Sequence, residues 1–141
     1  MAPKDPKLDL LKSIPIFEGL GEHQLEQIAQ LVDEADVPAG KVLMRQGEPG
    51  DEMFIVVHGN FTIDRDGNVI RDCSAGHALG ELNLLSQGLR SATVTANEPS
   101  RVLVVGHREF HALLEVAPEI ARHMLVNLAR QLRALDEDAV A

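Results

Sequence analysis

The most informative stretch of the chain is GHALGELNLLSQGLRSATV, residues 76–94. A glycine-bounded turn delivers one acid, Glu81, and a short apolar helical turn, a glycine and then Arg90 follow it. The start of a helix offers unpaired backbone N–H groups to an anion, and a guanidinium is a two-pronged donor suited to phosphate. A carboxylate only accepts hydrogen bonds, which suits a sugar hydroxyl. An acid beside an anion site is otherwise unfavourable, so the stretch predicts a ligand that carries both a phosphate and a hydroxyl.

The surrounding residues 40–106 are punctuated like an all-β region. Short runs rich in β-branched residues occur at 42–44, 53–57, 60–63, 69–70, 92–95 and 101–105. Turn signals separate these runs, and the strongest of them is the hairpin sequence DRDGN at 64–68. Many short strands at such intervals predict a barrel, a roll or a sandwich.

Helical spacing flanks this region on both sides. Residues 8–37 contain a short apolar turn that stops at Pro15 and a helix that opens at Gly21 and is expected to end at 38–40. Towards the C-terminus we expect a short helix over 109–114 and a longer one from Pro118. The chain therefore reads as one domain in three parts: a helical segment (1–39), the β region (40–106) and two C-terminal helices (107–141).

Composition excludes several classes of protein. A formal charge of −9 and a pI near 5.0 disfavour binding to DNA, RNA or acidic membrane surfaces. The single cysteine, Cys73, rules out an internal disulfide and fits a reducing compartment. The sequence has no apolar run long enough to span a membrane, and no secretory signal opens it, so we expect a cytoplasmic protein.

Two separated motifs resemble those of cyclic-nucleotide-binding domains. Residues 76–94 resemble the family's phosphate-binding cassette, with matches at Gly80, Glu81, Leu82, Leu84 and 90–94. Upstream, Gly40, Leu43, 45–48, 50–51, 54–56 and Gly59 resemble the early β-roll signature, and 14–20 resembles the N-terminal opening of the family. The resemblance covers nearly the whole chain.

The resemblance implies a role for individual residues. Gly80 and Glu81 would open the cassette helix, with Glu81 accepting the ribose 2′-OH, and Arg90 would pair with the cyclic phosphate. Backbone N–H groups around Leu82, Ser91 and Ala92 would contact the same phosphate. An apolar wall would lie beside the base, and the last helix would close over it; the residues implied are Met44, Ile63 and Ile70 for the wall and Gln131, Leu132 and Leu135 for the lid.

Three positions in the cassette bear on this assignment. Asn83 stands where the family prefers a small residue, and Leu89 replaces a frequent proline before the arginine. Neither change removes a group expected to contact the ligand. Alanine at position 91 usually accompanies cAMP and threonine cGMP, whereas serine occurs in bacterial cAMP binders, so Ser91 favours cAMP and leaves cGMP open.

The resemblance also implies an architecture and a mechanism. The fold would be mainly β, a roll of about eight strands of the jelly-roll kind, with N-terminal helices and a two-helix C-terminal lid. Ligand binding would reorganise the cassette turn, shift the helix over 109–114 and bring the C-terminal helix onto the base. Relatives that regulate transcription carry a helix-turn-helix after this helix; the chain ends at Ala141, so we expect no DNA-binding domain.

Other interpretations remain open at this stage. Glu81 and Arg90 could form a structural ion pair in a roll that binds no ligand and serves as a module for protein interaction. The chain could also be a regulatory piece of a larger enzyme, channel or transcription factor. His107 and His111 share a helix face, but no recognisable metal set completes them, and no catalytic constellation assembles, so we expect neither an enzyme nor a metal or cofactor. A leucine stripe at 125, 128, 132 and 135 is more typical of core packing than of a dimer interface, but the resemblance implies that the last helix can do both, so a homodimer stays open. The sequence does not identify a downstream protein target.

Overall fold

The computed structural model of the protein describes residues 6–139. Residues 1–5, which open the stretch where no secretory signal is expected, lie outside the described residues. Two compact units are present. The β-roll unit comprises Leu31–His111, and the described part of the helical unit comprises residues 6–30 and 112–139. Each unit is described separately below.

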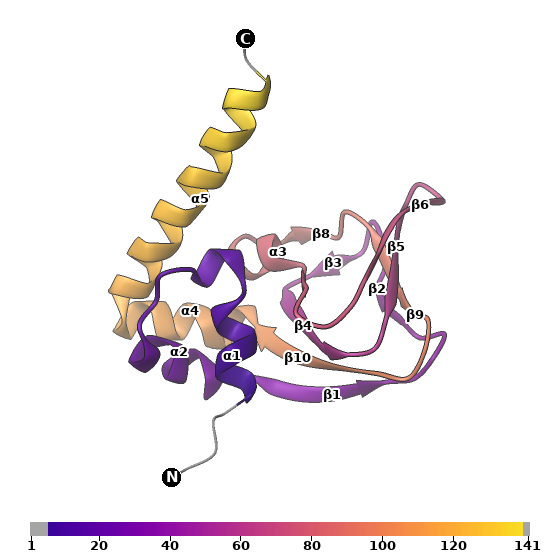
Figure 1. Cartoon of the computed structure of the whole chain (residues 1–141), viewed down its shortest axis with the longest axis horizontal. Helices are drawn as coiled ribbons and strands as arrows, with labels where there is room; N and C mark the ends of the chain where they lie inside the picture. The colour runs from indigo at the N-terminus through magenta and orange to yellow at the C-terminus, as the bar shows by residue number, and fades with distance from the viewer. Residues whose placement is uncertain (1–5, 140–141) are drawn as a thin grey trace. The chain divides into compact units, whose positions relative to one another are not determined.

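Two four-stranded antiparallel sheets and a short ribbon make up the β-roll unit (Figure 1). The first sheet has the order β1-β10-β4-β7, with β1 at Asp33–Val37, β10 at Ser100–Gly106, β4 at Glu52–His58 and β7 at Ala78–Leu79. The second has the order β2-β9-β5-β6, with β2 at Val42–Met44, β9 at Thr93–Ala96, β5 at Phe61–Arg65 and β6 at Asn68–Cys73. The ribbon pairs β3 (Pro49–Gly50) with β8 (Gly88–Leu89), and the helix α3 (Glu81–Leu85) precedes β8.

The register of the second sheet decides which side chains face the core. Directly paired residues lie on the same face of a sheet, and Met44, Val94 and Ile63 form one such row across β2, β9 and β5. All three belong to the buried core of the roll. The same row continues to Arg71 on β6, because Ile63 pairs with Arg71. A cationic residue therefore stands at the edge of an otherwise apolar interior face.

The hairpin between β5 and β6 has the turn that its sequence predicts. Arg65 pairs with Asn68, so Asp66 and Gly67 form a two-residue loop. Both have positive φ, 55° and 80°, as a hairpin turn of the primed type requires. The Gln46 side chain holds the turn, since its Nε2 donates to Asp66 Oδ1 (2.8 Å) and its Oε1 accepts from the Asp66 N–H (2.9 Å).

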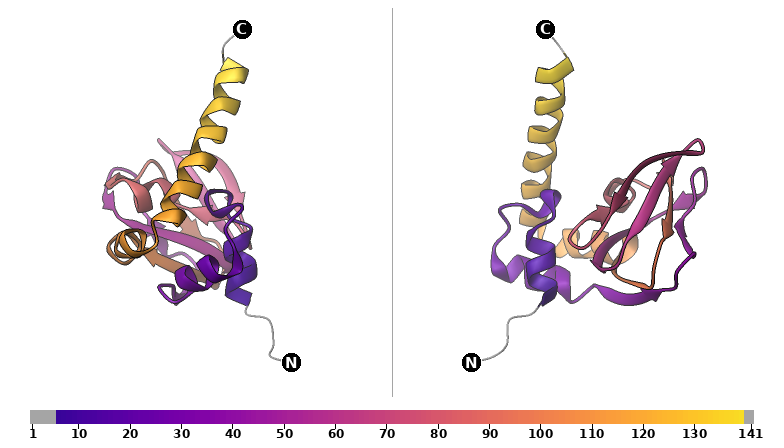
Figure 2. Two further views of the ribbon diagram at one scale, coloured as in Figure 1. Left: turned by 90° about the vertical axis from the view of Figure 1, so that its left-hand side faces the viewer. Right: turned by 45° about the vertical axis from the view of Figure 1, so that its right-hand side comes forward.

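Helices α1 (Pro6–Lys12), α2 (Glu22–Ala29) and α5 (Pro118–Ala139) form the helical unit, together with the 3-10 turn η1 (Pro15–Phe17). The buried Asn127 joins α5 to the segment around η1 by donating to the carbonyls of Ile16 (3.2 Å) and Glu18 (2.8 Å). Both views of Figure 2 show α5 as one uninterrupted helix. Within residues 6–139, none of the helices is both long enough and apolar enough to traverse a bilayer.

The chain passes from one unit to the other along α4 (His107–Val116). Its first five residues, up to His111, belong to the β-roll unit, and the remainder belongs to the helical unit. This helix contains the short helix expected over 109–114 and extends it at both ends.

The fold class is confirmed, but the expected helix over the N-terminal segment was too long. α2 ends at Ala29, and Asp33–Val37 is the strand β1, which pairs along its whole length with β10. Arg101 on β10 forms ion pairs with Glu34 and Asp36 on β1. The strand pairing of β1 with β10, which lies far along the chain, overrides the local helical spacing of the sequence. Residues 6–139 contain ten strands against the expected eight or so, and three of the ten, β3, β7 and β8, are only two residues long.

Candidate ligand-binding site

The segment 76–94 folds into β7, α3, β8 and the turn that carries Arg90. Gly80 is the residue before α3 and has φ 76°, a left-handed conformation that glycine adopts without strain. Glu81 follows it as the first residue of the helix. The backbone thus reverses at Gly80 and presents Glu81 at the start of α3, as the sequence predicts.

Arg90 is buried, with 6% of its surface exposed. Its Nη1 donates to the Glu52 carbonyl oxygen at 2.9 Å, and its guanidinium carbon lies 5.8 Å from the centre of the Phe54 ring. The backbone around it is also held: its N–H donates to Glu48 O (2.8 Å), and its carbonyl accepts from the Gly47 N–H (2.9 Å). Burial lowers the pKa of Arg90, while the carboxylates of Glu52 and Asp51 act in the opposite direction.

Two glycines make room for the guanidinium. A Cβ on Gly50 would overlap Nε and Cζ of Arg90, so no other residue fits there unless the arginine moves. A Cβ on Gly80 would lie 2.7 Å from Arg90 Nη1, 3.0 Å from Glu52 O and 3.5 Å from Met44 Cε. Arg90 therefore lies directly beside the turn that presents Glu81, and Met44 borders the same spot.

Glu81 is half-buried and lies within electrostatic reach of Arg71. Burial raises the pKa of its carboxyl, whereas its own backbone hydrogen bond and the Arg71 charge lower it. Across the described residues, no ion pair joins Glu81 to Arg90, and no carboxylate lies within ion-pair distance of Arg90. The structural ion pair considered from sequence is therefore not formed within the described chain.

A family model of the cyclic nucleotide-binding domain matches residues 34–116, which contain all of this geometry. The chain belongs to this family. The domain is 33% identical over 124 residues to an uncharacterised NTE family protein of Mycobacterium tuberculosis, covering 87% of this chain and 21% of that protein. It is 37% identical over 112 residues to a protein named cyclic nucleotide-gated potassium channel in Rhizobium etli, covering 79% of this chain and 31% of the other. The chain thus spans a fifth to a third of the length of these relatives.

Solved structures share the fold of this chain. The N-terminal domain of a transcriptional regulator from Streptomyces coelicolor superposes with a TM-score of 0.88 at 28% identity, covering 94% of this chain and 96% of that one. The regulatory domain of Toxoplasma gondii PKA, crystallised with cAMP, superposes with a TM-score of 0.71 at 28% identity, covering 78% of this chain and 46% of that one.

Asn83 has a structural role in this cyclic nucleotide-binding domain that its sequence position did not reveal. Its side-chain amide donates to the carbonyls of Gly50 (3.0 Å) and Gly88 (3.1 Å), one on each strand of the β3–β8 ribbon. The larger side chain at this position therefore fastens α3 to the strand that makes room for Arg90. The sequence signal was the departure from a small residue, but only the fold brings residues 50 and 88 together.

The predicted apolar wall is brought together in part. Met44 and Ile63 are buried and belong to the row that continues through Val94. Ile70 is 49% exposed and is not paired with Ile63, which faces Arg71 instead. Sequence reasoning missed Arg71 because an irregularity between Ile63 and Asp64 shifts the register, and no local pattern reveals such a shift.

The other predicted contact residues differ in exposure. Ala92 is buried, whereas Leu82 and Ser91 are exposed, and the Ser91 carbonyl accepts from Arg65 Nε (3.0 Å). The lid residues Gln131, Leu132 and Leu135 lie on α5 in the helical unit, and all three side chains are exposed. Their contact with a bound base stays a prediction.

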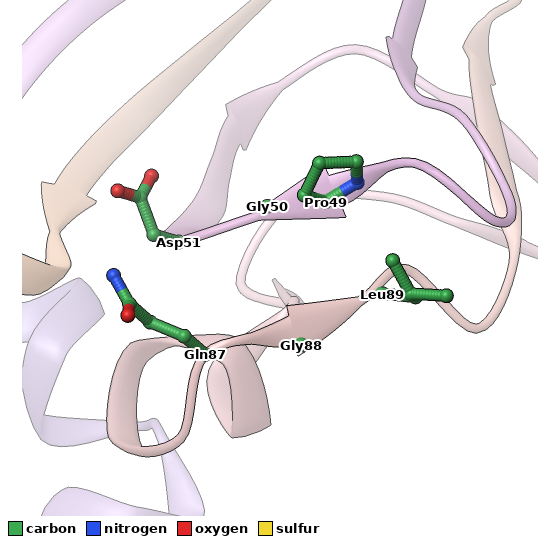
Figure 3. Close-up of a pocket in the computed structure, with 6 residues that line it drawn as sticks. All are labelled: Pro49, Gly50, Asp51, Gln87, Gly88 and Leu89. Carbon is green, nitrogen blue, oxygen red and sulfur yellow. The ribbon is translucent and has the colours of Figure 1, made fainter.

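A hollow of about 550 Å³ lies along the β3–β8 ribbon. Pro49, Gly50 and Asp51 line it from one strand, and Gln87, Gly88 and Leu89 line it from the other (Figure 3). Neither Glu81 nor Arg90 lines this hollow, but Gly50, which adjoins Arg90, does.

Proposed function

We propose that this domain is a cyclic nucleotide sensor whose ligand is cAMP. Arg90 binds the cyclic phosphate and Glu81 accepts the ribose 2′-OH. Backbone groups of the segments around Leu82 and Ala92 complete the phosphate contacts, and Met44 and Ile63 border the base. The domain acts by binding and not by catalysis, with no further cofactor or metal.

The observation that carries the proposal is a buried arginine without a carboxylate partner in the described chain. Burying a guanidinium is costly, and proteins usually pair such a charge with an anion. Arg90 instead contacts a neutral carbonyl and an aromatic face, and the carboxylates of Glu52 and Asp51 act on it only from beyond ion-pair distance. Five N–H donors belong to this side chain, and a phosphate would supply both the missing charge and the acceptors.

The choice of cAMP over cGMP rests on two supports. One is Ser91, which is found in bacterial cAMP binders of the family. The other is the structural neighbour from Toxoplasma gondii, which was crystallised with cAMP. A preference for cGMP would change the ligand and leave the roles of Arg90 and Glu81 unaltered.

We further propose that the domain signals through its C-terminal helices. Binding reorganises the cassette turn, shifts α4 and brings α5 onto the base, with Gln131, Leu132 and Leu135 nearest to it. The same leucine stripe on α5 can alternatively join two copies of the chain. Since the chain spans only part of its relatives, the sensor serves as a regulatory domain, in a cytoplasmic setting, for a partner still to be identified.

Thermal unfolding in the presence of cAMP, cGMP and 5′-AMP tests the proposal. A ligand that binds only the folded state raises stability by about 2.7 kcal/mol at a hundredfold excess over its Kd. We expect both cyclic nucleotides to raise the unfolding midpoint, cAMP more than cGMP, and 5′-AMP to leave it nearly unchanged. If no nucleotide raises the midpoint, the domain is a ligand-free interaction module, which is the alternative function.

A further inference from the structure

The carbonyl oxygen of Leu84 receives two imidazole groups from α4. His107 Nδ1 lies 2.8 Å from this oxygen and His111 Nε2 lies 3.1 Å from it. The two rings are neighbours on one face of the helix, with their centroids 4.1 Å apart. A carbonyl can only accept, so each ring must present an N–H group to it. Neutral His107 is thereby assigned the Nδ1–H tautomer and neutral His111 the Nε2–H tautomer.

The hydrogen bonds to the Leu84 carbonyl depend on the position of the cassette helix. Leu84 belongs to α3, three residues after Glu81, and its side chain is fully buried. Carbonyls in the last turn of a helix have no partner within that helix and need donors from elsewhere. Both of these donors come from α4, so any displacement of α3 changes two hydrogen bonds to α4 at once.

The start of α4 is also tied to the surroundings of Arg90. The His107 backbone N–H donates to Asp51 O at 3.0 Å, next to Glu52, whose carbonyl holds Arg90. His107 shares a hollow of about 270 Å³ with charged groups of both signs, Asp51, Glu52, Arg108 and Glu109. No cluster of three or more metal-ligating side chains occurs in the part of the chain that the structure describes, so the pair is not assigned to a metal.

We propose that His107 and His111 are positioning residues that couple the cassette helix α3 to α4. The inference rests on the proposed function, since it is the ligand at Glu81 and Arg90 that moves α3. α4 begins in the β-roll unit and continues into the helical unit. The two imidazoles therefore lie in the first part of α4, which belongs to the β-roll unit, before the helix continues into the helical unit.

Imidazole ¹⁵N–¹H correlation spectra of the full chain test the coupling directly. Without ligand, we expect the Nδ1–H pattern for His107 and the Nε2–H pattern for His111. Saturating cAMP shifts both sets of signals and leaves those of His58, an exposed histidine at the end of β4, in place. Signals of His107 and His111 that do not respond to bound cAMP would overturn the proposal.

Paired substitutions separate hydrogen bonding from packing. His107→Phe with His111→Phe keeps the rings and removes both donors, and we expect cAMP affinity to fall on the order of tenfold. His107→Asn with His111→Gln restores an N–H near each original position and should recover affinity to within about threefold. His58→Phe is the control for replacing a histidine as such, and each variant's unfolding midpoint verifies that it folds.

The outcomes also distinguish this inference from the proposed function. If the wild type binds cAMP and the variant with both phenylalanines binds it equally tightly, the coupling role is wrong and the proposed sensor function stands. No binding by the wild type removes the sensor, and the coupling role falls with it. Rescue by the Asn–Gln pair is the outcome that a purely space-filling role for the two rings does not produce.

Discussion

At the scale of single residues, the site depends on how closely backbone and side chain approach each other. Arg90 is held over Gly50 and beside Gly80, and the carbonyl of Glu52 and the ring of Phe54 orient its guanidinium. None of these groups cancels its charge. The result is a buried cation beside the turn that presents Glu81.

Replacing Gly50 by alanine tests this close approach. The new Cβ would overlap the guanidinium, so Arg90 must leave its position or the β3–β8 ribbon must shift. Overpacking of this kind costs about 1–3 kcal/mol, and we expect both the unfolding free energy and cAMP affinity to fall. Gly88→Ala on the paired strand is the matched control, because nothing lies within 4 Å of its added Cβ. Equal behaviour of the two variants would show that the contact with Arg90 is unimportant.

Glu81 makes a prediction about pH. Burial raises the pKa of its carboxyl in the folded state, so ionising Glu81 costs folding free energy. The stability contributed by the protonated form is present below the unfolded pKa and is lost as pH rises through the folded pKa. Glu81→Gln cannot ionise, so its unfolding midpoint should exceed that of the wild type increasingly as pH rises through this window and then level off.

Thermal unfolding of both proteins between about pH 4 and pH 7 measures this difference. The two midpoints should converge at the acidic end, where wild-type Glu81 is protonated as well. A difference that grows towards low pH would mean that the carboxylate is stabilised in the fold, contrary to our account.

At the scale of elements, α3 is a helix of five residues that relies on side chains for its position. Asn83 ties it to both strands of the β3–β8 ribbon, and the two histidines of α4 bind the carbonyl of Leu84. Helices this short are not stable by themselves. The cassette is therefore held in place by tertiary hydrogen bonds rather than by helix propensity.

Asn83→Ala removes the two bonds to the ribbon and leaves their carbonyls to find other partners. We expect a loss of about 1–3 kcal/mol in unfolding free energy and faster hydrogen exchange at the amides of α3 and Gly88. Asn83→Asp retains the shape of the side chain but replaces its donors by carboxylate oxygens that repel both carbonyls, so it should lose at least as much stability as the alanine variant. Asn97→Ala is the control: it removes a side-chain hydrogen bond to Thr62 on β5 and should leave exchange in α3 unchanged.

Some features of the strands and turns follow from local sequence, and others depend on residues far along the chain. The hairpin at Asp66 and Gly67 was predictable, because its two positive φ angles are encoded in the turn residues themselves. The strand β1 was not, because its pairing with β10 depends on residues far along the chain. Arg71 was missed for a related reason, since its face on β6 is decided by an irregularity in the ladder with β5.

At the scale of the whole molecule, the motifs in residues 40–94 were sufficient to predict the family and the fold class. Glu81 and Arg90 were predicted as ligand contacts from the cassette alone, since the motif contains both. The groups that contact Arg90, namely Gly50, Glu52 and Phe54, could not be assigned these contacts from sequence. Their contact with Arg90 exists only after β3 and β4 have been placed beside the cassette by the roll.

The stripe on α5 makes a prediction at this scale. Leu125, Leu132 and Leu135 are between 65% and 68% exposed, so substituting them should hardly change the stability of the unliganded chain. We expect Leu132→Glu with Leu135→Glu to weaken cAMP binding several-fold while the unliganded midpoint stays the same. Val116→Glu, another exposed apolar position, is the control.

Sedimentation velocity on the same variants distinguishes the two uses of the stripe. Weaker binding at unchanged mass indicates a lid, whereas halving of the mass indicates a dimer seam. If neither affinity nor mass changes, α5 has no part in sensing.

Calorimetric titration of cAMP into the wild type and Arg90→Ala tests the account most directly. A charge-assisted hydrogen bond contributes about 1.5–3 kcal/mol, so we expect the variant's Kd to rise on the order of ten- to hundredfold. Arg101→Ala removes an equal charge from β10, outside the cassette, and should bind like the wild type. The decisive quantity is the ratio of the Arg90→Ala and wild-type Kd values for cAMP, because it measures how far affinity depends on Arg90. Within the described residues, this buried guanidinium has no carboxylate at ion-pair distance. A folded Arg90→Ala domain that binds cAMP as tightly as the wild type would contradict the account.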